Sequence, residues 1–179
     1  MKCVDNDVGK CRAWGDPHVI TYDGATNDVY GVANYTFTQF NTSFENHTNR
    51  LEWSVIMQTA PVGRVSYASA FTLFVKNSMK DYLYSIRTDF SGNVLYSYNF
   101  TNSLVTSDDQ FEKYIRLNRR SGISYTTPFG LEVKQNGANG EVSVPAVYAG
   151  KLEGICGNFN YKVIDDFKCP DGKIWPFSV

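Results

Sequence analysis

Residues 51–58 read LEWSVIMQ, and in this segment Leu51, Trp53, Val55 and Met57 alternate with their neighbours. A repeat of two residues places one set of side chains on the inward face of a β-strand. The same period returns in five further segments, at 71–75, 82–86, 94–100, 129–133 and 142–144. The alternation therefore predicts strands along most of the chain, each with one buried face.

Short turn signals separate these segments. Glycine-containing pairs and triplets recur between the predicted strands, at 91–93, 121–122, 136–137 and 139–140. No run of a dozen residues carries the 3.6-residue period of an amphipathic helix, and the 12 Tyr, 12 Phe and 14 Gly also favour strands and turns. We predict an all-β fold, a sandwich of two antiparallel sheets that forms one domain.

Charge and motif content exclude several classes of protein. The 17 Lys and Arg against 18 Asp and Glu give a net charge of -1, whereas nucleic-acid-binding domains normally carry a basic excess. No apolar run is long enough for a transmembrane helix, so we expect no direct membrane insertion of this segment. The sequence contains no Gly-x-Ser-x-Gly, Walker or dinucleotide motif and no legible nucleophile–base pair, so we do not expect an enzyme.

The four cysteines lie near the two ends of the chain, at Cys3, Cys11, Cys156 and Cys169. Four cysteines allow three pairings, and their spacing alone does not choose among them. None of them forms a Cys-x-x-Cys pair, which disfavours a zinc site. Their placement suits two disulfides that tie the N- and C-terminal ends together; the alternative is four reduced thiols in a cytosolic protein.

Four asparagines stand in the N-glycosylation sequon, slightly more than chance gives for this content of Asn, Ser and Thr. We predict glycosylation at these positions, which are Asn34, Asn41, Asn46 and Asn99. Asn34 belongs to an alternating segment, so its use as an acceptor requires that its side chain face outward. The sequons support secretion mildly.

Two clusters at opposite ends of the chain carry the distinctive chemistry. The first is GDPH at 15–18 followed by YDG at 22–24. The second is GICGNFN at 154–160, followed by DDF at 165–167 and PDG at 170–172. Together, and in this order, they resemble the opening and closing motifs of the von Willebrand factor type D domain.

The resemblance covers residues 11–172, which leaves an N-terminal flank at 1–10 and a C-terminal flank at 173–179. It implies a disulfide between Cys11 and Cys156, and it leaves Cys3 to pair with Cys169. Such a pairing would bring the front and the back of the chain together in space.

The chain departs from the family pattern at Glu153, where the usual Cys-Gly-Leu-Cys element has its first cysteine. That element is associated with disulfide-linked assembly, so its loss lowers the expectation of covalent multimers. The sparse-cysteine pattern looks closest to the type D domains of transmembrane mucins and of sushi/nidogen-type cell-surface proteins. This implies an extracellular setting, either secreted or in a membrane-anchored ectodomain. The implied partners are neighbouring modules of the same chain and, beyond them, extracellular matrix or cell-surface proteins.

Oxygen ligands are concentrated in and after the second cluster. Asn158 and Asn160 lie two apart and would point the same way in an extended loop. Calcium takes six to eight oxygens from carboxylates, amides, backbone and water, and the absence of imidazole and thiolate ligands disfavours zinc or copper. With Asp23 added by the resemblance, the predicted Ca²⁺ ligands are Asp23, Asn158, Asn160, Lys162 (through its backbone carbonyl), Asp165 and Asp166. The alternative is an ordinary solvated loop.

The first cluster contains a chemically weak bond between Asp16 and Pro17. An Asp carboxylate can attack its own peptide carbonyl, and His18 is placed to protonate the departing proline nitrogen. The Gly-Asp-Pro-His sequence resembles the self-cleavage site of some mucin-type relatives, so Asp16, Pro17 and His18 are candidates for a single-turnover scission. The alternative is a plain turn at Asp16-Pro17 with His18 packed in the core.

These observations predict an extracellular structural or adhesive type D module, stabilised by calcium and disulfides, with a candidate cleavage site. Two alternatives remain open at this point. One is a self-processing signalling or shedding module, in which scission after Asp16 regulates the ectodomain. The other is an accessory domain of a lipid-transport protein of the vitellogenin or lipophorin kind, which also carry type D domains.

Overall fold

A computed structural model of the chain describes residues 8–41, 51–77, 82–98, 101–104 and 115–166. Apart from two short 3₁₀ turns, η3 (Ala146–Tyr148) and η4 (Val163–Asp165), the regular structure consists of β-strands. No helix in these ranges is long and apolar enough to cross a membrane. The all-β prediction is confirmed.

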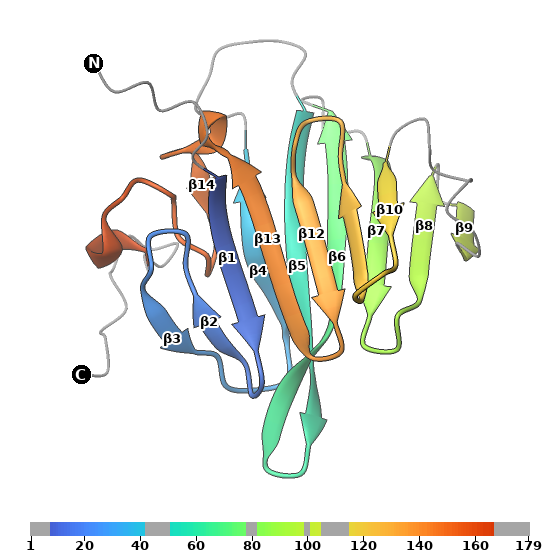
Figure 1. Cartoon of the computed structure of the whole chain (residues 1–179), viewed down its shortest axis with the longest axis horizontal. Coiled ribbons are helices and arrows are strands. Elements are labelled where there is room, and N and C mark those ends of the chain that lie inside the picture. The colour runs from blue at the N-terminus through green and yellow to red at the C-terminus, as the bar shows by residue number, and fades with distance from the viewer. Residues whose placement is uncertain (1–7, 42–50, 78–81, 99–100, 105–114, 167–179) are drawn as a thin grey trace.

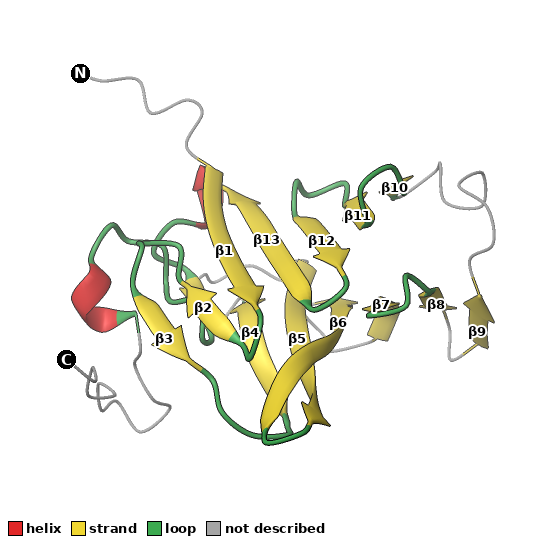
Figure 2. Ribbon diagram, turned by 60° about the horizontal axis from the view of Figure 1, so that its bottom comes forward, coloured by secondary structure: helices red, strands yellow, loops and turns green. Residues whose placement is uncertain are grey.

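In the described residues the strands form two sheets of seven, and every pairing between these strands is antiparallel. Sheet A contains, in spatial order, β10 (Arg116–Asn118), β11 (Ile123–Thr126), β12 (Glu132–Asn136), β13 (Asn139–Pro145), β1 (Val8–Trp14), β2 (His18–Ile20) and β3 (Thr26–Asp28). Sheet B contains β14 (Leu152–Glu153), β4 (Asn34–Phe40), β5 (Leu51–Val62), β6 (Val65–Asn77), β7 (Tyr82–Asp89), β8 (Val94–Tyr98) and β9 (Thr101–Leu104). Figures 1 and 2 show the two sheets as stacked layers, which is the predicted sandwich.

The core lies between the two layers and is built from the alternating residues that the sequence indicated. In β5, Trp53, Val55 and Met57 are buried while their neighbours are only half-buried. In β6, Phe71, Leu73 and Val75 are buried, while the residues between them are half-buried. In β13, Val142 and Val144 are buried. Because successive strand residues face opposite sides, the inward set of each strand forms half of the core.

One close approach between the sheets depends on a glycine. Gly140 of β13 faces Phe71 of β6, whose ring is fully buried and packs edge-on against Phe37 at 5.3 Å between ring centroids. A β-carbon at Gly140 would overlap the ring of Phe71. The absence of a side chain here therefore sets the local spacing between the layers.

The alternation at 129–133 predicts a strand that begins too early, because β12 starts at Glu132. Thr127 closes a turn instead: its carbonyl accepts the N–H of Gly130 at 3.0 Å, and its hydroxyl accepts the N–H of Leu131 at 3.1 Å. Phe129 therefore lies in the turn, where its ring stacks on Trp53 at 6.3 Å between centroids. A turn that packs an apolar residue against the core mimics the period of a strand.

The inward face predicted for 94–100 holds only at its start. Val94 is buried, Tyr96 is half-buried, and Tyr98, the last residue of β8, is 54% exposed. Burial is therefore lost toward the end of this strand, which lies next to the edge of sheet B.

Candidate functional site

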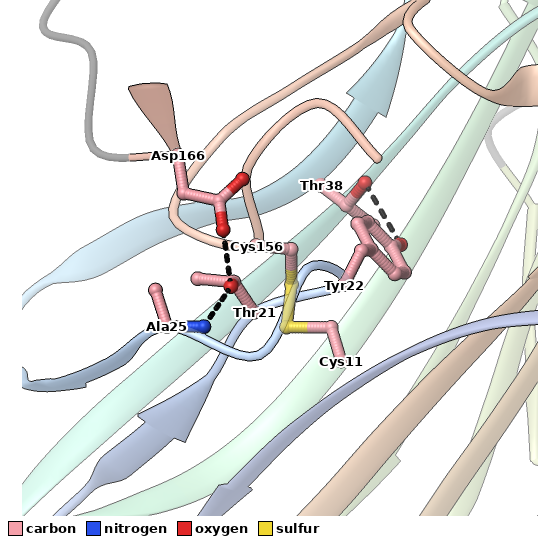
Figure 3. The surroundings of a disulfide bond; sticks show 7 residues. All are labelled: Cys11, Thr21, Tyr22, Ala25, Thr38, Cys156 and Asp166. Atoms are coloured by element: carbon pink, nitrogen blue, oxygen red, sulfur yellow. Dashed lines mark hydrogen bonds between the residues drawn. A yellow bond between two sulfur atoms is a disulfide. The ribbon is translucent and has the colours of Figure 1, made fainter. Parts of the chain in front are cut away.

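A disulfide joins Cys11 of β1 to Cys156, 145 residues further along the chain, with 5.6 Å between the two α-carbons. Both cysteines are fully buried. Figure 3 shows the bond close to Thr21 and Tyr22. The predicted Cys11–Cys156 disulfide is confirmed, whereas Cys3 and Cys169 lie outside the described residues.

The segment around Cys156 is fixed against strand β4. The N–H of Ile155 donates to the carbonyl of Thr36 at 3.0 Å, and the N–H of Cys156 donates to that of Phe37 at 2.9 Å. Gly154, with a φ of +117°, lies so close to β4 that a β-carbon would come within 2.8 Å of both carbonyl oxygens. Only glycine combines this conformation with this proximity.

The first cluster rests directly on the second. The N–H of Tyr22 donates to the carbonyl of Cys156 at 3.0 Å. Beside it, the hydroxyl of Thr21 donates to Oδ2 of Asp166 at 2.5 Å and accepts the N–H of Ala25 at 2.9 Å, as Figure 3 shows. The two ends of the chain therefore meet in space, through hydrogen bonds as well as through the disulfide.

Asp23 organises the loop that follows Cys156. Its two carboxylate oxygens accept the N–H groups of Asn160 and Tyr161, each at 2.9 Å. Phe159 and Tyr161 have positive φ angles of 56° and 65°, a conformation that costs about 1–2 kcal/mol for a residue with a side chain. Asp23 thus holds a strained loop from the opposite end of the chain, and such strain often marks a functional site.

The amides of the loop converge on Asp165. The side-chain amides of Asn160 and Asn158 donate to its Oδ2 at 2.9 and 3.4 Å. The amide oxygen of Asn160 accepts the N–H of Lys162 at 2.8 Å. Asn158, Asn160 and Asp165 are therefore neighbours, as their sequence positions predicted. For Lys162, the contact that the structure shows is made by the backbone N–H, not by the predicted carbonyl.

Several oxygens of this loop are buried without a partner. In the described part of the chain, six buried side-chain polar atoms make no hydrogen bond, and three of them are Oδ1 atoms of Asn158, Asp165 and Asp166. An orphaned buried oxygen is costly, about 1–3 kcal/mol, so three in one loop require an explanation. Oδ1 of Asp166 also points at Gly157, where a β-carbon would overlap it.

Burial raises the pKa of Asp166 to about 7, and the nearby carboxylates of Asp23 and Asp165 add to the rise, while the hydrogen bond from Thr21 opposes it. This is the signature of negative charge crowded into a site with little water. Across the described ranges, no three His, Cys, Asp or Glu side chains gather into a metal centre by themselves. A cation here would need amide and backbone oxygens together with the acids.

The predicted scission site lies at the connection between β1 and β2. Nε2 of His18 is 3.0 Å from Oδ1 of Asp16, and Nδ1 of His18 is 2.6 Å from Oδ1 of Asp28 on β3. The side chain of His18 is 42% exposed, so the alternative of a core histidine is wrong. The hydrogen bond to Asp28 and the charges of Asp28 and Asp16 raise the pKa of His18. The structure therefore brings together an Asp-Pro bond and a basic imidazole.

A search of protein-family models matches residues 11–173 to the von Willebrand factor type D domain. The chain belongs to this family. Human zonadhesin is 30% identical over 96% of the chain, human IgGFc-binding protein 27% identical over 96%, and hemocytin of Bombyx mori 25% identical over 92%. The chain spans only 6%, 3% and 5% of the lengths of these relatives. It is therefore a type D domain of the kind found within much longer proteins.

Two of the four sequons of this type D domain can be placed. Asn34, the first residue of β4, is exposed, which meets the condition that its side chain face outward. Asn41 is also exposed. Asn46 and Asn99 lie outside the described residues. Glycosylation of the type D domain stays a prediction.

Sequence reasoning missed three side chains that complete the sites of this type D domain. Thr21 donates a hydrogen bond to Asp166. Asp28 is hydrogen-bonded to His18, and Tyr30 donates a hydrogen bond to Asp28. Thr21 stands two residues before Asp23, so a search around the acidic motif could have found it. Asp28 becomes a neighbour of His18 only through the β2–β3 register, which pairs the two residues directly.

Proposed function

We propose that this type D domain is a calcium-stabilised structural module of a larger extracellular adhesive protein. A buried disulfide persists in oxidising compartments, which supports the extracellular setting. Relatives such as zonadhesin and hemocytin, many times longer than this chain, support the role of a module among others. Its first partners are then the neighbouring modules of its own chain, followed by matrix or cell-surface proteins.

The observation that carries the calcium proposal is the set of orphaned oxygens on Asn158, Asp165 and Asp166, next to the carboxylate of Asp23. Carboxylate and amide oxygens without nitrogen or sulfur ligands suit a hard cation such as Ca²⁺. The residues that would hold the ion are Asp23, Asn158, Asn160, Asp165 and Asp166, with a backbone carbonyl of the loop, such as that of Lys162. When bound, Ca²⁺ supplies the positive charge that the crowded carboxylates need and links the two ends of the chain.

Millimolar calcium is expected to stabilise the domain by about 2 kcal/mol relative to EDTA, because an ion that binds only the folded state adds its binding free energy. The melting temperature should rise accordingly. Asp165→Asn keeps an oxygen for the amides of Asn158 and Asn160 but removes a charge, so this variant should lose most of the calcium response. Thermal unfolding of both proteins, each with calcium and with EDTA, measures the effect.

A matched control is Asp89→Asn, which removes an acid at the end of β7, where it accepts the N–H groups of Ser91 and Asn93 in the following turn. This variant should respond to calcium as the unmodified domain does. Identical melting curves of the unmodified domain in calcium and in EDTA would contradict the proposal.

A second candidate function is a single self-cleavage between Asp16 and Pro17, and the contact of 3.0 Å between His18 and Asp16 favours it. In the reaction, the Asp16 carboxylate attacks the carbonyl carbon of its own peptide bond and forms a cyclic anhydride. The bond to the Pro17 nitrogen breaks, and the imidazolium of His18 gives that nitrogen its proton. Water then opens the anhydride to two carboxylates. Of the two protons released, one returns to His18 and the other charges the new terminal amine.

Incubation near pH 5.5 is expected to yield two fragments, 1–16 and 17–179. Because Cys11 and Cys156 fall on different fragments, the pieces should separate only after reduction. Mass spectrometry with and without reductant measures both events. His18→Ala should slow the scission about 100-fold, the usual contribution of a general acid. His47→Ala, which removes the other of the two histidines, is the control. An intact mass after days at this pH would contradict self-cleavage.

A further inference from the structure

His18 is held from two sides by acids of different strands. Oδ1 of Asp16, from the turn just before β2, lies against Nε2, and Oδ1 of Asp28, from β3, lies against Nδ1. The strand register places His18 directly opposite both Asp28 and Trp14, and the ring of Trp14 lies 5.7 Å from the imidazole between centroids. The imidazole therefore has a defined orientation on a partly exposed surface.

Asp28 is itself fixed. Its second carboxylate oxygen accepts the hydroxyl of Tyr30 at 2.9 Å, and the backbone carbonyl of Tyr30 accepts the hydroxyl of Tyr35 at 2.9 Å. Tyr30 is 72% exposed, so this chain of contacts adds little burial. The hydrogen bond with His18, and after it the one from Tyr30, lower the pKa of Asp28, which keeps its carboxylate charged at mildly acidic pH.

We propose that Asp28 is the positioning residue of the self-cleavage reaction, holding the His18 imidazole so that Nε2 faces the Asp16 carboxylate beside the Asp16-Pro17 bond. This inference rests on the proposed self-cleavage. The Asp28 carboxylate accepts the Nδ1 proton of His18, so Nε2 is left to face Asp16. Tyr30 supports the arrangement by fixing Asp28. Neither Asp28 nor Tyr30 touches the reacting atoms.

The same contact sets the pH at which His18 carries its proton. The charged groups that face the imidazole are Asp28 on β3 and Asp16 in the preceding turn, while β1 contributes the ring of Trp14. Both acids favour the imidazolium, and the hydrogen bond to Asp28 is the largest cause of the raised pKa of His18. Since the imidazolium is the proton donor, scission should increase as the pH falls through that pKa.

The test compares the full chain with Asp28→Asn and Tyr30→Phe. Asparagine is close in size to aspartate, so the fold is largely kept, but its neutral amide oxygen holds the Nδ1 proton more weakly than the carboxylate does, and the charge is lost. In Asp28→Asn, the pKa of His18 should fall, and the midpoint of the scission–pH profile should move to lower pH. Near pH 6.5 the rate should fall by about 10-fold, less than the loss expected for removal of His18 itself. Tyr30→Phe leaves the Asp28 carboxylate charged but less firmly fixed, so it should slow scission by a smaller factor without moving the midpoint of the profile to lower pH.

Two readouts are needed, the scission–pH profile from fragment masses and the titration of the His18 ring protons by NMR. Glu153→Gln, which removes an exposed acid of β14 that accepts from Gln39, is the matched control and should leave both unchanged. Equal scission profiles for Asp28→Asn and the unmodified chain would overturn the proposal, even if the NMR titration shifts. An unmodified chain that never cleaves, but whose His18 titration shifts as expected in Asp28→Asn, would defeat self-cleavage itself. The positioning role would fall with it, and only the electrostatic coupling would remain.

Discussion

Replacing Cys11 and Cys156 together by alanine is expected to lower the free energy of unfolding by about 4–5 kcal/mol. The disulfide closes a loop of 145 residues, and a crosslink over such a loop removes much of the conformational entropy of the unfolded chain. For a domain of this size, each kcal/mol lowers the melting temperature by about 2–4 °C, so the midpoint should fall by about 10 °C or more. Urea titration at neutral pH measures the change.

Reduction supplies the control for this prediction. The comparison is made with Cys3 and Cys169 also replaced by alanine, so that Cys11–Cys156 is the only disulfide that a reductant can break. A reductant should then bring the domain close to the unfolding midpoint of the variant that lacks Cys11 and Cys156, and it should leave that variant unchanged. If the double variant and the oxidised unmodified domain unfold at the same urea concentration, the disulfide does not reduce the conformational entropy of the unfolded chain enough to matter, and the entropic argument is wrong.

Gly140→Ala is expected to destabilise the domain by about 3 kcal/mol, at the upper end for overpacking of a core. The added methyl group would overlap the ring of Phe71, which is fully buried and packs on Phe37. Neither the ring nor the backbone of β13 can move aside without disturbing the contact between the sheets. Chemical denaturation of the variant measures the loss.

A double-mutant cycle identifies the cause. Phe71→Leu alone should destabilise the domain by about 1–2 kcal/mol through lost volume. Because leucine leaves room beside β13, Gly140→Ala should then cost much less in the Phe71→Leu background than it does alone. Strictly additive losses would show that the clash with Phe71 is not the reason.

The strands were predictable because one physical rule, burial of alternate residues, acts along most of the chain. It placed Trp53, Val55 and Met57 correctly. It failed at Phe129, where a turn holds a half-buried aromatic ring against the core, and at Tyr98, where a strand continues beyond the buried part of its sheet. Alternation reports which residues are apolar, while the extent of the opposite layer decides which of them are covered.

The site residues could be predicted where they belong to a motif with a recognisable chemistry. Residues outside the motifs, which only the fold brings into contact, could not. The meeting of Asp23 with the second cluster followed from the family resemblance, and the structure shows it through Asn160. Thr21 and Asp28 gave no such signal. Thr21 contacts Asp166, which lies 145 residues further along the chain. Asp28 contacts His18 because of the register between β2 and β3, two strands of three residues each.

The crosslink between β1 and the end of the domain also governs how tension passes through it. A pull applied at Cys11 and Cys156 passes directly through the bond between them, so the 145 residues that separate them in sequence, roughly 500 Å of extended chain, bear none of the load. Scission after Asp16 cuts the chain within the segment closed by the disulfide, so the covalent connection through Cys11 and Cys156 stays intact. Under such a pull the sandwich would act as a short, inextensible link.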